Sequence, residues 1–257
     1  MAAETYSAQV IVLRKTKLGE SDLILSLLAQ DGSQLRVVAK GARKPSNSFA
    51  ARLELYSLAE VLCCKGRNLD IVQEARLLCA NEKLRCDMDY AAGAAPMAEL
   101  LDKVSESGLE YPRLFEMSST ALSSLAQALP QDIPAHTAAH LLKTLAFVGL
   151  RPTLSACAVC GTEVRLEEEQ PTLRLSFGEG GVLCGSCRLT HKSVAVSSNM
   201  CQWVQVLLAS TFSQIAALEL DAQTAGQVLE FCRLWIREHI GANLKSLDFL
   251  LSMRGQV

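Results

Sequence analysis

Four cysteines in two closely spaced pairs are the residues of this chain best suited to chemistry. Two residues separate Cys157 from Cys160 and Cys184 from Cys187, and 23 residues lie between the pairs. Two intervening residues let one tight turn aim both sulfurs at a single ion, and the longer interval allows a short β-excursion that brings the pairs together. The spacing therefore predicts one closed, tetrahedral zinc site of the structural kind, with all four cysteines as ligands.

Other interpretations of these cysteines are two disulfides or four unrelated buried thiols. The N-terminus has neither the cationic start nor the apolar core of an export signal, which favours a reducing compartment and hence a metal. His191 lies close after Cys187 and could replace one cysteine ligand. With four protein ligands no position is open to water, so we expect the zinc to hold the chain together and not to do chemistry.

Composition and charge divide the chain into a mildly basic N-terminal part, residues 1–80, called the head below, and an acidic remainder, residues 81–257. The 257 residues are 49% apolar and are enough for two modules with real cores. Residues 1–80 carry a net charge of +3 and residues 81–257 carry −5, so we expect any nucleic-acid contact to lie in the head. The apolar runs are too short to span a membrane, and we expect a soluble, cytoplasmic protein.

The head shows the pattern of a small β-barrel. Short β-rich segments are separated by tight turns at Asp31-Gly32 and at residues 66–68. The five expected strands are residues 6–15, 22–30, 33–40, 56–65 and 69–78. We predict an OB-fold nucleic-acid-binding domain over residues 1–80, with an SH3-like barrel as the nearest competitor on strand count.

After residue 81 the apolar spacing becomes helical. Apolar residues recur at intervals of three and four, and prolines and glycines mark the ends of the segments. The expected helices are residues 88–107, 113–129, 135–148, 200–218, 222–240 and 246–253. The zinc module at residues 150–195 lies between helical segments, so we predict an α+β, multidomain chain whose helical domain, residues 81–257, carries the module as an insertion.

The cations of the head gather at its turns, which points to phosphate binding. The longest cationic loop, residues 40–48, also offers hydroxyl and backbone N–H groups that suit phosphate oxygens. Aromatic residues for base stacking are scarce in the head, which favours sequence-tolerant contacts to the backbone; the alternative is a solvated loop that needs charge for solubility. The candidate DNA-binding residues are Lys15, Lys17, Arg36, Lys40, Arg43, Lys44, Arg52, Lys65 and Arg67.

No catalytic constellation is found in the sequence. His136 and His140 have the spacing of a helical metal pair, but Thr137 stands where a zinc protease would place its glutamate. We expect both histidines to lie on a helix surface. No phosphate-binding loop of the Gly-Lys-Ser/Thr type is present, so nucleotide binding is not expected, and the residues do not describe an enzyme.

Taken in order, several segments resemble the RecO family of bacterial DNA-repair proteins, which are recombination mediators. Any one segment is weak, but their order and spacing are specific, and together they run over nearly the whole chain. The segments are Leu18-Gly-Glu-Ser-Asp-Leu-Ile-Leu, Val37-Val-Ala-Lys-Gly-Ala-Arg-Lys, Leu142-Lys-Thr-Leu-Ala-Phe-Val-Gly-Leu-Arg-Pro, Cys157-Ala-Val-Cys-Gly, Gly180-Gly-Val-Leu-Cys-Gly-Ser-Cys and Leu244-Lys-Ser.

The resemblance implies non-catalytic work in the RecFOR pathway of DNA repair. Members combine an N-terminal OB domain with a helical domain that carries the cysteine module. They bind single- and double-stranded DNA, anneal complementary strands and, with RecR, help RecA onto DNA coated by single-strand DNA-binding protein, whose C-terminal tail is the expected contact. Some members have lost the cysteines, so the resemblance implies a zinc ion that is structural and dispensable to the core activity.

Two other classes of function remain open from the residues. One is a zinc-ribbon module that binds another protein and never contacts DNA. The other is a thiol switch, in which oxidation of the cysteine pairs releases zinc and unfolds the module.

Overall fold

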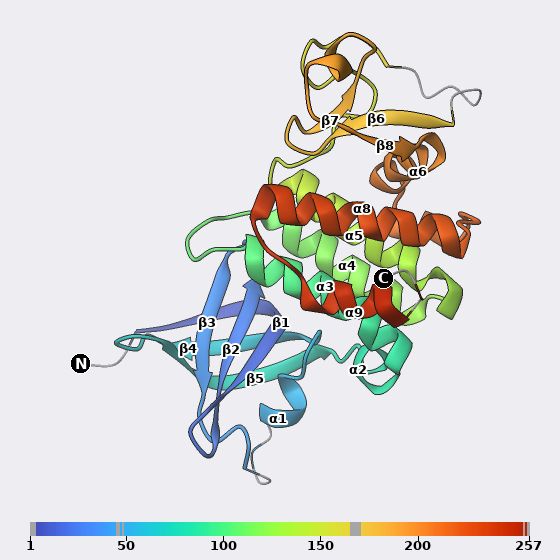
Figure 1. Cartoon of the computed structure of the whole chain (residues 1–257). Helices are drawn as coiled ribbons and strands as arrows, with labels where there is room; N and C mark the ends of the chain where they lie inside the picture. The colour runs from blue at the N-terminus through green and yellow to red at the C-terminus, as the bar shows by residue number, and fades with distance from the viewer. Residues whose placement is uncertain (1–3, 45–46, 48, 165–170, 254, 256–257) are drawn as a thin grey trace. The chain divides into compact units, whose positions relative to one another are not determined.

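The chain forms two compact units, Met1–Gln127 and Ala128–Val257. The structure is a computed structural model that describes residues 4–44, 47, 49–164, 171–253 and 255 (Figure 1). The first unit contains a β-barrel followed by helices, and the second contains helices and a small three-stranded sheet.

Five strands of the first unit close into a barrel in the order β1-β2-β3-β5-β4. Neighbouring strands are antiparallel, except that β3 and β5 run parallel. This is the topology of an OB-fold, so the predicted five-stranded barrel is confirmed. The strands are β1 (Thr5–Leu18), β2 (Asp22–Ala29), β3 (Gln34–Ala39), β4 (Leu58–Cys64) and β5 (Asp70–Cys79).

Strand β1 is long because it pairs with two neighbours in succession. Its first half pairs with β4 and its second half with β2, and a register shift between Val12 and Arg14 marks a bulge in the pairing with β2. Before the bulge, Val10 and Val12 face the barrel core, where they meet Leu25 and Leu27 of β2. The alternation of apolar side chains therefore fills the barrel while the bulge redirects the rest of the strand.

The turn between β2 and β3 depends on the predicted Asp31-Gly32 pair. The Oδ1 atom of Asp31 accepts a 2.8 Å hydrogen bond from the backbone N–H of Ser33. Gly32 adopts a φ of +82°, and a Cβ atom at this position would overlap the backbone of Tyr111. Glycine is therefore required here both for the turn and for the close approach of a later segment.

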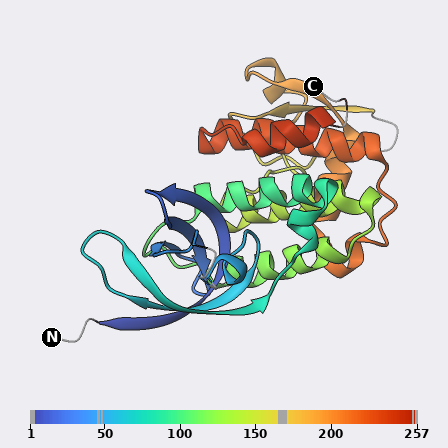
Figure 2. The same cartoon turned by 90° about the horizontal axis from the view of Figure 1, so that it is seen from below.

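Helices following the barrel complete the first unit. Helix α3 packs against β1 and β2 and also contacts α4 (Figures 1 and 2). The compact unit therefore continues to residue 127, whereas the composition of the chain predicts a domain boundary after residue 80, which stays a prediction. Helix α1 (Phe49–Arg52) lies between β3 and β4, and the helices that follow the barrel are α2 (Lys83–Cys86), α3 (Met88–Val104) and α4 (Pro112–Gln127).

The second unit is built around α5 (Ile133–Phe147), which packs against α6, α7 and α8. The cysteine segments adjoin a sheet with the order β7-β6-β8. The other helices are η1 (Pro130–Asp132), η2 (Cys187–Leu189), α6 (Ser198–Ala209), α7 (Phe212–Ile215), α8 (Ala222–Ile240) and α9 (Lys245–Met253). The strands are β6 (Thr172–Ser176), β7 (Gly181–Leu183) and β8 (Val194–Ser197). No helix in the described parts of the chain is long and apolar enough to cross a membrane.

Two expectations about the helices are wrong. The single helix expected over residues 200–218 is divided, because Thr211 starts α7 with a capping box in which its backbone N–H donates to the side chain of Gln214. His136 and His140 do not lie on a helix surface: both are buried, with 1% and 0% of their area exposed. Residues 133–142 of α5 are all buried, so the helix is enclosed around its whole circumference there and its histidines are buried with it.

Candidate nucleic-acid interface and metal centre

Two turns bring the four predicted cysteine ligands together in the second unit. Cys157 and Cys160 lie in a turn that ends at Gly161, whose φ is +73° and whose N–H donates to the carbonyl of Cys157. Cys184 directly follows β7, and Cys187 begins η2. The four Sγ atoms lie within 4.8 Å of one another, so this group can hold one metal ion.

The sulfur geometry suits a tetrahedral ion better than disulfides. The Sγ atoms of Cys160 and Cys184 are 3.6 Å apart, and all four cysteines are free thiols. In a tetrahedral site with bonds of about 2.3 Å, sulfur atoms lie about 3.8 Å apart, whereas a disulfide bond is about 2.05 Å long. The donor set therefore fits one ion coordinated by four sulfurs.

The electrostatics of the cluster also favour a bound cation. Burial opposes ionisation of Cys157, but backbone N–H groups of Cys160, Cys184 and Val159 outweigh it and lower the pKa to about 6. For Cys187, burial and the three neighbouring sulfurs raise the pKa to about 12. Four thiolates in one cluster repel one another, and a cation between them removes this penalty.

His191 could have replaced one of the cysteine ligands, but it does not belong to the group of side chains that converge on the metal site. Its Nδ1 atom lies 3.2 Å from the backbone oxygen of Cys187 and 3.0 Å from the hydroxyl of Thr190. Within the described residues, the group of side chains that can hold a metal around this point consists of the four cysteines.

A groove of about 1000 Å³ on the barrel brings three of the predicted cations together. Lys40, Lys44 and Arg52 line it, beside the side chain of Phe49. None of the ion pairs among the described residues uses Lys40 or Lys44. Of the predicted loop at residues 40–48, Lys40, Gly41, Lys44 and Asn47 line the groove; residues 45, 46 and 48 lie outside the described part of the chain.

Asp22 holds this loop beside the turn between β1 and β2. Its Oδ1 atom accepts a 2.8 Å hydrogen bond from the N–H of Gly41. This bond, a bond from Ser21 and the nearby charges of Lys40 and Lys44 lower the pKa of the Asp22 carboxyl. The loop is therefore fixed at its start, so Lys40 projects from an ordered backbone.

Three other predicted cations, Lys15, Arg43 and Lys65, have partners within the first unit. Lys15 forms a 2.8 Å ion pair with Glu54. Arg43 donates from Nη1 to the backbone oxygens of Gly19 and Glu20, at 3.2 and 2.8 Å. These contacts give Lys15 and Arg43 a structural role at the end of the barrel.

Lys65 lies in a cluster that fixes the connection between β4 and β5. It is 3.7 Å from a carboxylate oxygen of Asp70 and lies over the ring of Tyr6, and the hydroxyl of Tyr6 donates to Asp70 at 2.7 Å. Asp70 also accepts from the N–H of Gly66 at 3.0 Å. The turn that carries Arg67 is thus anchored at its base, and Arg67 itself is exposed.

The remaining predicted cations lie away from the groove lining. Arg36 is exposed on β3 and pairs with Ser26 of β2, and Lys17 is exposed near the end of β1. The structure therefore gathers some of the predicted cations in one groove and distributes the others over the barrel strands and turns.

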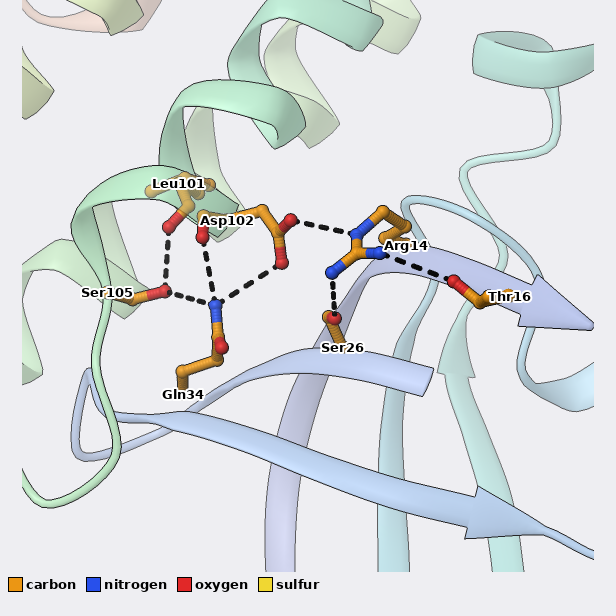
Figure 3. A network of polar contacts seen from close by, with 7 residues as sticks. All are labelled: Arg14, Thr16, Ser26, Gln34, Leu101, Asp102 and Ser105. Atoms are coloured by element: carbon orange, nitrogen blue, oxygen red, sulfur yellow. Dashed lines mark hydrogen bonds and ion pairs between the residues drawn. The ribbon is translucent and has the colours of Figure 1, made fainter. Parts of the chain in front are cut away.

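The sequence interpretation missed two arginines of the barrel. Arg76 lines the groove but is paired with Glu60 at 2.6 Å. Arg14 lies in a polar network with Asp102 (Figure 3). Both occur inside strands, away from the turns where most of the predicted cations lie.

Aromatic residues contribute little to the barrel surface, as expected. Tyr56 is buried, and the hydroxyl of Tyr6 is bonded to Asp70. Phe49 is the aromatic side chain among the residues lining the groove.

Two family models match the chain. The model described as "Recombination protein O N terminal" matches residues 1–80, and the one described as "Recombination protein O C terminal" matches residues 85–248. The chain belongs to the RecO family. The family resemblance carried by the ordered sequence segments is thereby confirmed.

Curated relatives agree with this RecO assignment. The "DNA repair protein RecO" of Desulfitobacterium hafniense is 30% identical over 245 residues, covering 94% of this chain and 87% of that protein. The protein of the same name from a Roseiflexus species is 29% identical, covering 99% of this chain and 88% of its own length. The Bifidobacterium longum protein is 35% identical over 184 residues, covering 70% and 72%. The chain is a DNA repair protein of the RecO family.

Proposed function

We propose that this RecO-family chain is a non-catalytic recombination mediator whose barrel binds single- and double-stranded DNA through its phosphates. The observation that supports this proposal is the groove lined by Lys40, Lys44 and Arg52. Because the two lysines take part in no ion pair among the described residues, their ammonium groups are available to phosphate oxygens. Binding releases counterions from DNA and depends little on base sequence.

Strand annealing follows from the same charges. Two complementary strands repel each other through their phosphates, and a cationic barrel that neutralises part of this charge lowers the repulsion while leaving the bases accessible. Scarce stacking aromatics in the barrel are compatible with bases that remain available for pairing.

We propose the protein partners of this chain from its membership of the RecO family. RecR and the C-terminal tail of single-strand DNA-binding protein are the direct partners, and RecA is loaded indirectly onto the DNA. We assign the protein to the cytoplasm, at the nucleoid, because its proposed substrate is there.

Zinc is the ion we propose for the cysteine cluster. Four thiolates in a closed tetrahedral site are a structural zinc set, and no ligand position is open for a reaction. Cys157, Cys160, Cys184 and Cys187 would hold the ion, which supplies cohesion to the module and takes no part in DNA binding.

The test is a salt titration of DNA binding with the full chain. The variant Lys40→Ala/Lys44→Ala removes the two unpaired lysines of the groove, and fluorescence anisotropy of a labelled single-stranded oligothymidylate measures its affinity. Each phosphate contact contributes about −0.7 to the slope of log K against log salt for single strands. The double variant should therefore have a slope shallower by about 1.4 and bind about 25-fold more weakly at 0.1 M salt.

A matched variant controls for the loss of two charges. Lys103→Ala/Arg113→Ala removes two exposed cations from the same compact unit but outside the barrel, and should keep the wild-type slope. If the groove variant binds as the wild type does, the cations serve solubility alone. A wild type that does not bind DNA would favour a protein-interaction module.

A further inference from the structure

A polar network connects the outer face of the barrel to helix α3. The Nε atom of Arg14 donates to Oδ2 of Asp102 at 2.8 Å, although the two residues are 88 positions apart in the sequence (Figure 3). Gln34 donates from Nε2 to the other carboxylate oxygen of Asp102 at 3.2 Å and to its backbone oxygen at 3.0 Å. The carboxylate of Asp102 is thus shared between an arginine of β1 and a glutamine of β3.

The bulge in β1 places Arg14 on this outer face. Up to the bulge, even-numbered residues such as Val10 and Val12 point into the barrel core, so an unbroken strand would direct Arg14 inward. The register shift after Val12 instead pairs Arg14 with Ser26, and the two side chains meet on the outside. A charged residue thereby avoids the apolar core and stays half-exposed on the outside of the barrel, although Ser26 beside it is buried.

Ser26 also pairs directly with Arg36 on its other side. Directly opposed residues of neighbouring antiparallel strands point to the same face, so Arg14 and Arg36 flank Ser26 on one surface. Two strand spacings separate them, which corresponds to about 10 Å between their Cα atoms. Both arginines are exposed while Ser26 between them is buried, so a phosphate backbone that crosses here would contact the guanidinium groups and not the serine.

The guanidinium of Arg14 is held firmly but keeps hydrogen-bonding capacity. It donates to Asp102 from Nε, to Thr16 from Nη1 at 3.3 Å and to Ser26 from Nη2 at 3.2 Å. An arginine has five N–H donors, so two remain without a partner among the described residues. The side chain is 49% exposed, whereas that of Asp102 is 13% exposed. The open donors therefore belong to the part of the network that solvent can reach.

We infer that Arg14 is a further phosphate-binding residue of the barrel and that Asp102 is its positioning residue. This inference rests on the proposed DNA binding. The three hydrogen bonds fix the guanidinium before DNA arrives, so that less side-chain freedom is lost on binding. Asp102 thus assists the binding of an anion although it carries a negative charge itself.

The two possible roles of Asp102, as a charge and as a positioning residue, predict opposite effects of Asp102→Asn on DNA affinity. If Asp102 acted only through its charge, Asp102→Asn would remove a repulsive group and tighten DNA binding. If Asp102 positions Arg14, the same substitution loosens the guanidinium and weakens binding, by roughly two- to fivefold at 0.1 M salt. In an Arg14→Ala background nothing is left to position, so Asp102→Asn should then tighten binding slightly.

The experiment measures the affinity of the full chain for a labelled oligothymidylate as a function of salt. Arg14→Ala should make the slope shallower by about 0.7 and weaken binding about fivefold at 0.1 M salt. Arg14→Lys keeps the charge but cannot make the same fork of contacts, so its slope should stay near the wild-type value while its affinity falls.

Two control variants separate positioning from general effects. Asp89→Asn removes an exposed carboxylate from the same helix, remote in sequence from Asp102, and should not weaken binding. Ser105→Ala removes the 2.6 Å bond to the oxygen of Leu101 and the contact with Gln34, but leaves the carboxylate of Asp102 in place (Figure 3). It tests whether loosening the attachment of α3 is enough to impair DNA binding.

The inference is overturned if Arg14→Ala keeps the wild-type slope and affinity, or if Asp102→Asn tightens binding in the presence of Arg14. It is also overturned if Ser105→Ala weakens binding as much as Asp102→Asn does, because Asp102 would then act through the fold alone. A wild type that fails to bind would instead refute the proposed function itself.

Discussion

Acidification should destabilise the second unit through a buried histidine. His140 lies on α5 with none of its area exposed, and burial lowers its pKa to about 3. The same side chain in the unfolded chain has a pKa of about 6.5. Between these two values the unfolded state binds a proton that the folded state does not, so the free energy of unfolding falls as the pH falls.

The size of the stability loss follows from the difference between the folded and unfolded pKa values of His140. Each pH unit between 6.5 and 3 costs about 1.36 kcal/mol for one histidine, so His140 should cost about 2 kcal/mol at pH 5. His136 adds to the loss in the same direction, because burial also lowers its pKa and Asp132 offsets only part of the shift.

Urea unfolding at a series of pH values measures this loss. Both tryptophans, Trp203 and Trp235, lie in the second unit, so their fluorescence reports on its unfolding. The variant His140→Gln keeps a polar side chain but cannot titrate. It should reduce the pH dependence of the unfolding free energy by about 1.4 kcal/mol per unit between pH 4 and 6.

Thr144 provides the matched control. It lies one turn further along α5, is fully buried, and its hydroxyl has no hydrogen-bond partner among the described residues. Thr144→Val removes that hydroxyl at nearly constant volume, so stability should hold or rise at every pH while the pH dependence is unchanged. The reasoning is refuted if His140→Gln retains the full wild-type pH dependence.

Two further predictions concern the metal and a turn. Cys184→Ser should lower the zinc content measured by elemental analysis from one ion per chain to none and lower the urea midpoint of the tryptophan signal, while oligothymidylate affinity is unchanged; full zinc occupancy in the variant would contradict the assignment. Gly32→Ala should destabilise the first unit by at least about 2 kcal/mol by circular dichroism, because its Cβ would overlap the backbone of Tyr111. Gly19→Ala, with a φ of +58° but open space around it, should cost only about 1–2 kcal/mol, and an equal loss in both variants would show that the overlap is absent.

The sequence predicts the elements whose determinants are local. The turn at Asp31-Gly32 lies where the sequence predicts it. Two helix ends have equally local determinants: Ser197 accepts from the N–H of Met200 before α6, and Gly241 after α8 is in the αL conformation. The cysteine pairs are also local signals, because each needs only one turn, and their meeting requires one short sheet. These features could be located before any tertiary contact was known.

The errors in the helical part had signals that were overlooked. The break between α6 and α7 is marked in the sequence by Thr211 and Gln214 at the spacing of a capping box. The burial of His140 is indicated by the composition of α5, in which Lys143 is the one charged residue, so the helix has no strongly polar face to turn toward solvent. The spacing of His136 and His140 resembles that of a helical metal pair. Spacing says nothing of exposure, however, which depends on what packs around each side chain.

The attachment of α3 to the barrel could not be predicted in the same way. Strict alternation along β1 would have directed Arg14 into the core, and only the pairing with β2 reveals the bulge that turns it outward. Its partner Asp102 belongs to a segment that composition groups with the helices and that the fold joins to the barrel. A change of composition marks where the strand pattern ends, but a compact unit ends where side-chain contacts end. The residues that connect barrel and helix therefore lie on both sides of the boundary that the composition predicts.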